Sequence, residues 1–317
     1  MSDFHIPVLL EETISALAIR TDGCYVDATV GGGGHAKEIV KQIASGRLLA
    51  LDQDEEALAE ARTKLAPWAE HITFVHSNFR HLGNVLEEQN MPEVDGILMD
   101  IGVSSHQLDT GERGFSYHSD APLDMRMDRQ ADVPTAKEIV NTYSEQQLTD
   151  LFYRYGEERW SKRIAQFIVV ERGAKPLETS FDLVKVIQKA IPKKVRMQDK
   201  HPARRVFQAL RIEVNHELDA LESGLEQAAS HLALHGRLCI ITFHSLEDRI
   251  VKNAFRRLAE GPTLPAGLPI RACDYASDFR ICTRKPIEAS KEEQERNPRA
   301  RSAKLRVLER IAHQQEE

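Results

Sequence analysis

Several features that would place this chain in a special class of proteins are scarce or missing. It has only four cysteines among 317 residues, and no Cys-x-x-Cys pair, which argues against a zinc site or a fold held by disulfides. Its longest apolar runs, such as residues 237–243, have the length of a strand and are too short to span a membrane. The first residues have neither the basic nor the apolar part of a signal peptide. We therefore expect a cytoplasmic protein with reduced, mostly buried thiols, no metal and no membrane.

The composition favours a folded protein whose charge is unevenly distributed. Hydrophobic residues make up 41% of the chain, enough for a large core. The net charge of −7 is divided into −15 for residues 1–150 and +8 for residues 151–317. The basic second half could face phosphate groups, although the overall charge does not favour nucleic acid.

Strand and helix patterns alternate in the first hundred residues and return near the C-terminus. Repeated βα units predict a parallel sheet with right-handed crossovers. We expect strands at 24–27, 47–52, 72–75, 94–100, 237–243, 280–284 and 304–309, and helices at 36–44, 55–65, 82–89 and 245–258. Between the two parts the pattern is helical, at 145–155, 160–172, 181–191 and 202–225. The prediction is a doubly wound α/β domain of residues 1–108 and 226–317, interrupted by a mostly helical domain of residues 109–225.

A glycine-rich loop follows the first expected strand. Gly31, Gly33 and Ala36 match Gly-x-Gly-x-x-Ala, and such a loop lets backbone N–H groups approach a ligand at a helix start. It lacks the Lys-Ser/Thr ending of an NTPase loop. Asp52 ends the second strand 21 residues after Gly31, where a carboxylate can bind both hydroxyls of a ribose. NAD and S-adenosylmethionine both fit, so an NAD-dependent dehydrogenase remains an alternative.

Two residues favour S-adenosylmethionine over NAD. Asp27 directly precedes the glycine loop, where it would repel a pyrophosphate but could bind an ammonium group. Phe79 follows the third strand and could cover an adenine. Each has a simpler explanation: Asp27 can cap the loop, and Phe79 can belong to the core.

Asp100 ends the strand expected beside the first one. Ligands of open parallel sheets bind at this switch point, at the carboxyl ends of the strands. Methyl transfer needs the nucleophile in line with the methyl group and a free lone pair. The Asp100 carboxylate could accept a hydrogen bond from an exocyclic amine and make that lone pair available. The alternative is that Asp100 only caps the following turn.

Ten segments together resemble one family, that of the small-subunit ribosomal RNA cytosine-N4 methyltransferases, or MraW (ribosomal RNA small subunit methyltransferase H) family. The resemblance extends from about residue 5 to residue 310. It rests on HIPVLLEE (5–12), DATVGGGGHA (27–36), DIGVSSHQLD (100–109), RGFS (113–116), APLDMRMD (121–128), YGEER (155–159), HPAR (201–204), FQALRIEVN (207–215), FHSLEDR (243–249) and NPRARS (297–302).

The resemblance implies a Rossmann-like class I methyltransferase fold with an inserted helical domain. It implies that S-adenosylmethionine methylates N4 of a cytidine in the decoding region of 16S rRNA, in the bacterial cytoplasm. By position in the motifs, the residues that bind the cofactor would be Gly33, Gly34, His35, Asp52, Phe79, Asp100 and Gln107, with Asp100 also catalytic. DIGV stands where many amino-methylating enzymes have Asp/Asn-Pro-Pro-Tyr/Phe, so the side chain that stacks on the base is not assigned.

A basic stretch marks the helical part. Residues 189–211 contain eight lysines and arginines and one acid, a composition that can neutralise phosphates or form a solvated helix face. The candidate RNA contacts are Lys193, Lys194, Arg196, Arg204 and Arg205. Tyr153, Tyr155, Trp160 and Phe207 are candidates for a wall against the flipped base. DNA, protein or a small molecule remains an alternative substrate to the small ribosomal subunit, and the sequence leaves the oligomeric state open, a homodimer included.

Overall fold

The computed structural model describes residues 7–104, 107–108, 111–196, 201–260 and 277–311. The chain divides into two compact units. Met1–Gly102 and Leu218–Glu317 form the first, here called the sheet unit, and Val103–Glu217 form the second, the helical unit. No helix in the described part of the chain is long and apolar enough to cross a membrane.

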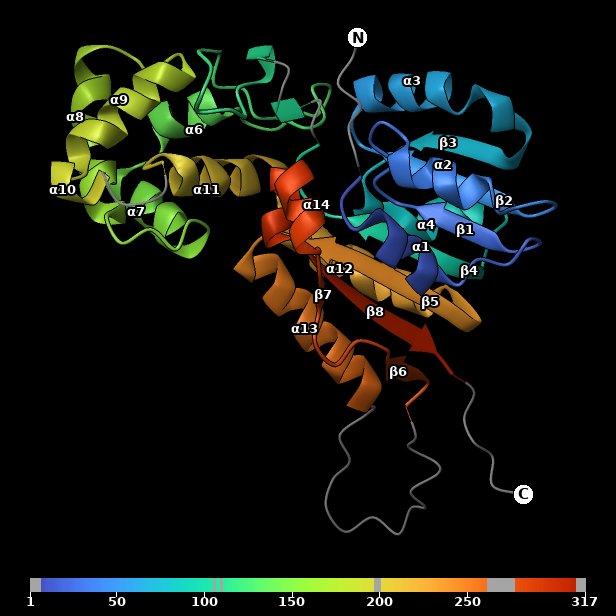
Figure 1. The fold of residues 1–317 in the computed structure, drawn as a ribbon. Helices are drawn as coiled ribbons and strands as arrows, with labels where there is room; N and C mark the ends of the chain where they lie inside the picture. Colours follow the sequence, from blue (N-terminus) through green and yellow to red (C-terminus); the bar gives the residue numbers. More distant parts are fainter. Residues whose placement is uncertain (1–6, 105–106, 109–110, 197–200, 261–276, 312–317) are drawn as a thin grey trace. The chain divides into compact units, whose positions relative to one another are not determined.

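The sheet unit is built on one sheet with strand order β3-β2-β1-β4-β5-β8-β6, and β7 pairs with β8 (Figure 1). The first five strands pair in parallel, and β8 runs antiparallel to β5, β6 and β7. The chain moves outward from β1 to β3 and then returns to place β4 beside β1. This reversal is the switch point of a doubly wound fold. The strands are β1 (Cys24–Asp27), β2 (Arg47–Asp52), β3 (Ile72–His76), β4 (Val94–Asp100), β5 (Leu232–Thr242), β6 (Phe279–Ile281), β7 (Ile287–Glu288) and β8 (Lys304–Arg310).

Helices cover both faces of this sheet. One apolar cluster joins the strands to α1 (Leu10–Leu17), α2 (Gly34–Val40) and α3 (Glu55–Lys64). A second cluster joins them to α4 (Leu82–Glu88), α12 (Glu217–Ser230) and α13 (Ser245–Glu260). The resulting three layers confirm the predicted α/β class. The sequence pattern did not predict α1, β7 or the short helix α14 (Lys291–Arg296).

The single helix predicted over 202–225 is wrong. The chain instead forms α11 (Arg204–Asn215) and α12, which are separated at His216 by a left-handed backbone with φ of 49°. From Leu218 the chain belongs to the sheet unit, because Ala220, Leu221 and Leu225 pack into its core. The boundaries therefore fall after residues 102 and 217, whereas the sequence pattern predicts them after 108 and 225.

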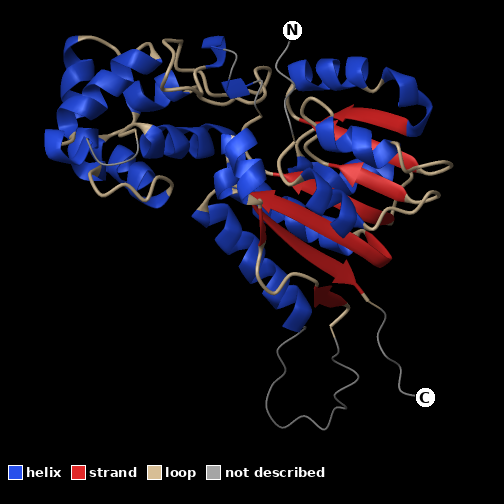
Figure 2. Cartoon of the chain, in the orientation of Figure 1, coloured by secondary structure: helices blue, strands red, loops and turns tan. Residues whose placement is uncertain are grey.

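The helical unit consists of helices and loops in its described part (Figure 2). Its helices share one apolar core. The Asn215 side chain joins α11 to the loop that contains Met125 and Met127. It donates to Met125 O at 2.8 Å and accepts from Met127 N at 2.7 Å. Buried Arg113 also donates to Met127 O, at 2.9 Å. The helices are α6 (Ala136–Thr142), α7 (Glu145–Arg154), α8 (Ser161–Ala174), α9 (Ser180–Ala190), α10 (Lys193–Arg196) and α11.

The described cysteines are all free thiols. Cys239 is buried and Cys24 is half-buried, whereas Cys282 is exposed and is the exception, among the described cysteines, to the expected mostly buried thiols. Cys282 is exposed because it directly follows the short strand β6 at the edge of the sheet. Cys273 lies outside the described residues.

Candidate active site at the carboxyl edge of the sheet

Carboxylates from four segments mark the carboxyl edge of the parallel strands. Asp27, Asp52 and Asp100 end β1, β2 and β4, and parallel strands bring such ends to the same edge. The fourth carboxylate belongs to Glu247, in the first turn of α13 after β5. Asp27 and Glu247 are buried. Acidic side chains are seldom buried without a compensating partner, so this concentration points to a functional site.

The glycine loop is closed tightly and tied to Asp52. Asp52 Oδ2 accepts from Gly31 N at 2.8 Å, and Oδ1 accepts from Asp54 N at 2.9 Å. Gly33 has φ of 76°, and a Cβ on Gly34 would lie 2.3 Å from Pro7 Cγ, so neither position suits another residue. Burial raises the pKa of Asp52 to about 6 despite these hydrogen bonds. Each oxygen keeps a second lone pair, so the carboxylate can still accept ribose hydroxyls.

Asp27 does cap the loop, as the simpler interpretation proposed. Its carboxylate accepts from Thr29 N at 3.2 Å and from the backbone N–H of Ala36. Burial raises its pKa to about 7, and the charge on Asp52 adds to the rise. The ammonium contact that the sequence suggested for Asp27 stays a prediction.

Asp100 is the least compensated member of the group. Its backbone N donates to Thr29 Oγ1 at 2.7 Å, but its buried Oδ1 has no hydrogen-bond partner among the described residues. Burial raises the pKa of Asp100 to about 8, with further contributions from the charges on Asp27 and Glu247. A buried oxygen without a donor is costly, and this one is suited to receive a hydrogen bond from a ligand.

His35 faces Asp100 in a fixed orientation. Its Nε2 lies 3.1 Å from Val8 O, and since a carbonyl can only accept, Nε2 carries the proton of that hydrogen bond. Its Nδ1 lies 3.8 Å from Asp100 Oδ2. The imidazole is buried and lies close to Asp100. The predicted contact between His35 and the cofactor remains untested.

The pair of His244 and Glu247 is the part of this site that sequence reasoning missed. Glu247 Oε2 accepts from His244 N at 3.2 Å, and Glu247 N donates to His244 Nδ1 at 3.4 Å. These reciprocal bonds form a helix cap with the spacing of a capping box. It lies one residue before Ser245-Leu-Glu-Asp248, a segment whose sequence has the same pattern. Glu247 Oε1 also lies 2.9 Å from His244 Nε2. The His-x-x-Glu spacing was the available signal.

Phe79 and Gln107 occupy structural environments. Phe79 is 8% exposed in the sheet-unit core, and a Cβ on Gly224 would lie 2.6 Å from its ring. This packing fits the simpler, core interpretation of Phe79. Gln107 belongs to the helical unit and is buried there, with Oε1 accepting from Ser104 N at 3.0 Å. The predicted cofactor contacts of both residues remain untested.

Most of the side chains predicted to contact phosphate are exposed to solvent. Lys193, Lys194, Arg204 and Arg205 are exposed, although Arg205 also donates to Glu157 O at 3.0 Å. Arg196 belongs to α10, but its side chain lies outside the described part. Two other cations of the same stretch are neutralised: Lys189 pairs with Glu171 at 2.9 Å, and Arg211 pairs with Glu217 at 2.7 Å.

The aromatic residues proposed to face the base differ in exposure. Tyr153 is 68% exposed, whereas Phe207 is buried and Tyr155 and Trp160 are packed against the core of the helical unit. His201 stacks on Tyr117 with ring centres 4.6 Å apart. Tyr153 alone of the four presents most of its side chain to solvent.

Comparison with known proteins identifies the family. The sequence model of the MraW methylase family matches residues 2–311. The chain belongs to the MraW methylase family. Ribosomal RNA small subunit methyltransferase H of Clostridioides difficile (strain 630) is 54% identical over 312 residues, which cover 98% of this chain and 100% of the relative. The protein of that name from Heliobacterium mobile is 55% identical over 313 residues, with the same coverage.

Among solved structures, an rRNA methylase from Streptococcus thermophilus aligns with 98% of this chain and 100% of its own, at 10% identity and a TM-score of 0.40. Membership of the MraW methylase family removes the dehydrogenase alternative.

Proposed function

We propose that the protein transfers a methyl group from S-adenosylmethionine to N4 of a cytidine in the decoding region of 16S rRNA. The coarser activity follows from the family and from relatives named for small-subunit ribosomal RNA methylation: the protein is an S-adenosylmethionine-dependent rRNA methyltransferase. The proposal adds that the methylated atom is N4, that the nucleoside is a cytidine, and that this cytidine lies in the decoding region. It places the reaction in the cytoplasm.

The residues of the site fit S-adenosylmethionine, which supplies a methyl group activated by a positively charged sulfur. When they are ionised, Asp27 and Asp100 favour a cation and oppose the pyrophosphate of NAD. We assign the ribose hydroxyls to Asp52, and the close backbone approach to Gly33 and Gly34. The main supporting observation is the buried Asp100 Oδ1, which lacks a donor among the described residues.

Asp100 has a second role toward the cytosine amine. The N4 lone pair is delocalised into the ring, and a carboxylate that accepts one N4–H hydrogen bond makes it more available. After methyl transfer the nitrogen must lose a proton, which the ionised Asp100 carboxylate can accept. The raised pKa of about 8 makes this ionised form the minor one at neutral pH, and the positive charge of the sulfonium favours it. The imidazole of His35 stands 3.8 Å away and limits the orientations of Asp100.

RNA binding is assigned to the exposed cations of the helical unit, Lys193, Lys194, Arg204 and Arg205, together with Arg196. Phosphate contacts of this kind position an RNA without reading its sequence. The target cytidine must be unstacked before its amine can reach a carboxylate inside a protein. Tyr153 is the candidate to stack on it or on a neighbouring base.

The test uses tritiated S-adenosylmethionine and small subunits from a strain that lacks this enzyme. We expect one labelled nucleotide, a cytidine of the decoding region, with the methyl group on N4. Asp100→Asn is the matched variant, because it keeps the shape of the side chain but removes its charge, and it should abolish labelling while the protein stays folded. Label on another atom or in another RNA would refute the proposal.

A further inference from the structure

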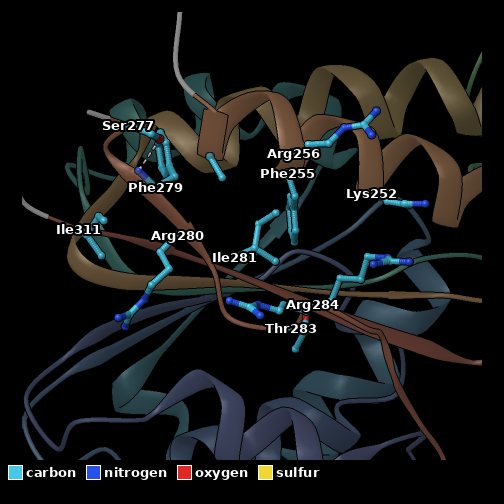
Figure 3. Close-up of a pocket in the computed structure, with 12 residues that line it drawn as sticks. Lys252, Phe255, Arg256, Ser277, Phe279, Arg280, Ile281, Thr283, Arg284 and Ile311 are labelled. Atoms are coloured by element: carbon cyan, nitrogen blue, oxygen red, sulfur yellow. Dashed lines mark hydrogen bonds between the residues drawn. The ribbon is translucent and has the colours of Figure 1, made fainter. Parts of the chain in front are cut away.

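A cavity lies in the sheet unit, between α13 and the loop and strand around β6 (Figure 3). Its volume is about 650 Å³, which is within the range of small-molecule sites. Lys252 and Arg256 line it from α13, and Arg284 lines it from the chain that follows β6. None of the residues used in the methyl-transfer site lines this cavity.

The cations around the cavity differ in how far they are already neutralised. Arg306 pairs with Asp248 at 2.7 Å, and Arg280 pairs with Glu309 at 3.1 Å. In Figure 3, Arg280 extends away from Phe255 and Ile281. Lys252 and Arg284, by contrast, have no ion-pair or hydrogen-bond partner among the described residues. Because no acidic residue in the described part of the chain lines the cavity, these two cations are left to attract an anion.

The remaining wall of the cavity is apolar and partly aromatic. Phe255 is buried, and its ring lies close to Ile281 (Figure 3). Phe279, which also lines the cavity, is half-buried. Cations next to an aromatic and aliphatic surface match a nucleotide, whose phosphate is charged and whose base has an apolar face. A free phosphate would make no use of the apolar wall.

The same helix links this cavity to the methyl-transfer site. Glu247, whose charge acts on Asp100, is in the first turn of α13, and Lys252 follows it by five residues. A rise of 1.5 Å per residue puts Lys252 about 8 Å further along the helix axis. In the sheet, Ile281 of β6 pairs with Leu308 of β8, and Leu308 pairs with Leu238 of β5, whereas Asp100 pairs with Ile241. The β6 wall of the cavity is therefore three strands and three residues, roughly 17 Å, from Asp100, a distance that an RNA strand of a few nucleotides spans.

We propose that this cavity binds a nucleotide of the ribosomal RNA other than the methylated cytidine. Lys252 and Arg284 bind its phosphate, and the base lies against Phe279 and Ile281. The inference rests on the proposed function, since it requires RNA as the substrate. It adds a contact outside the helical unit that extends the RNA-binding surface and fixes the direction of the strand.

The test compares Lys252→Ala/Arg284→Ala with Lys41→Ala/Arg47→Ala. The control pair removes the same charge from exposed residues at α2 and β2, far from β6 in the strand order. Binding of the small subunit is titrated from 50 to 300 mM salt. We expect the cavity variant to bind about tenfold more weakly and its salt slope to fall by about 0.7 to 0.9, since one phosphate is no longer neutralised. Affinity for S-adenosylmethionine and kcat at saturating RNA should not change.

Three results would overturn the inference. One is an RNA affinity and salt slope equal to those of the control pair. The other two are that the cavity variant binds RNA as the wild-type protein does, but binds polyglutamate, or vesicles of anionic phospholipid, more weakly than the wild-type protein. If the wild-type protein binds the subunit but labels no nucleotide, the proposed function fails instead, and the binding comparison still decides the fate of the cavity. Phe279→Leu, which keeps an apolar side chain, should weaken binding without changing the salt slope.

Discussion

Replacing Asp100 by asparagine should make the protein more stable at high pH while it abolishes methylation. The pKa of Asp100 is about 8 in the folded protein, because of burial and of the charges on Asp27 and Glu247, and about 3.9 in the unfolded chain. Between these values the folded state holds a proton that the unfolded state has released. Stability is therefore lost as the pH rises from about 4 to about 8. Asparagine has no charge to bury and avoids this loss.

The size of the effect follows from the difference in pKa. A rise of about 4 units at 1.36 kcal/mol each sets an upper limit of about 5 to 6 kcal/mol. The side chain of Asp100 is 25% exposed, so water screens part of this cost. We expect the stability gain of Asp100→Asn to be about 2 kcal/mol larger at pH 8.5 than at pH 5. Urea unfolding followed by circular dichroism at the two pH values measures it.

Asp248→Asn provides a control of opposite sign. Burial alone would raise the pKa of Asp248, but the Arg306 guanidinium and the Lys304 ammonium outweigh it and hold the pKa below its usual range. Folded and unfolded titrations of Asp248 both end below pH 5, so its replacement should destabilise the protein equally at the two pH values. The reasoning is refuted if Asp100→Asn loses stability at pH 8.5, or gains the same amount at both.

Three further expectations concern the same sites. Asp52→Ala should raise the Kd for S-adenosylmethionine at least tenfold and change kcat less, as cofactor titration beside methyl incorporation would measure; equal losses would contradict the ribose role. Glu247→Gln should lower the pKa of Asp100, since the Glu247 charge raises it, so the acidic limb of the kcat profile should move to lower pH; an unmoved limb would contradict this coupling. Arg204→Ala/Arg205→Ala should reduce the salt slope of RNA binding by about 1.5 to 2, and an unchanged slope would remove these residues from the phosphate surface.

The strands that carry the site could be predicted from the sequence because their signals are local. β1, β2 and β4 are buried, nearly continuous apolar runs, and each stops at an aspartate. The predicted bounds of 24–27, 47–52 and 94–100 agree with the structure. Buried parallel strands produce such runs, and the glycines after β1 mark the ligand loop independently of any tertiary contact.

The break at His216 could not be predicted, because apolar residues keep their helical spacing through it. Histidine carries no strong signal for a left-handed turn, and no glycine marks the end of α11. The prediction of one uninterrupted helix also excluded an ion pair between Arg211 and Glu217, because residues six apart in a helix do not face each other. The turn at His216 brings Glu217 back to Arg211 at 2.7 Å, which removes Arg211 from the phosphate contacts that a count of cations suggests.

The pair of His244 and Glu247 was missed for a related reason. Serine is a much commoner helix cap than histidine, so local preference favoured Ser245 with Asp248. A tertiary contact competes with this preference. Asp248 pairs with Arg306 of β8 at 2.7 Å, and Arg306 is almost sixty residues further along the chain. No pattern within a helix contains this information.

Tertiary contacts also limit how far net charge can indicate an RNA-binding surface. The second half of the chain is basic by eight charges, yet Lys189, Arg211 and Arg306 are all engaged by carboxylates. The cations that remain for phosphate include Lys252 and Arg284, outside the stretch that is richest in basic residues. Since an ion pair must be broken before its cation can bind a phosphate, we expect RNA affinity to depend on these unpaired cations more than on the overall charge.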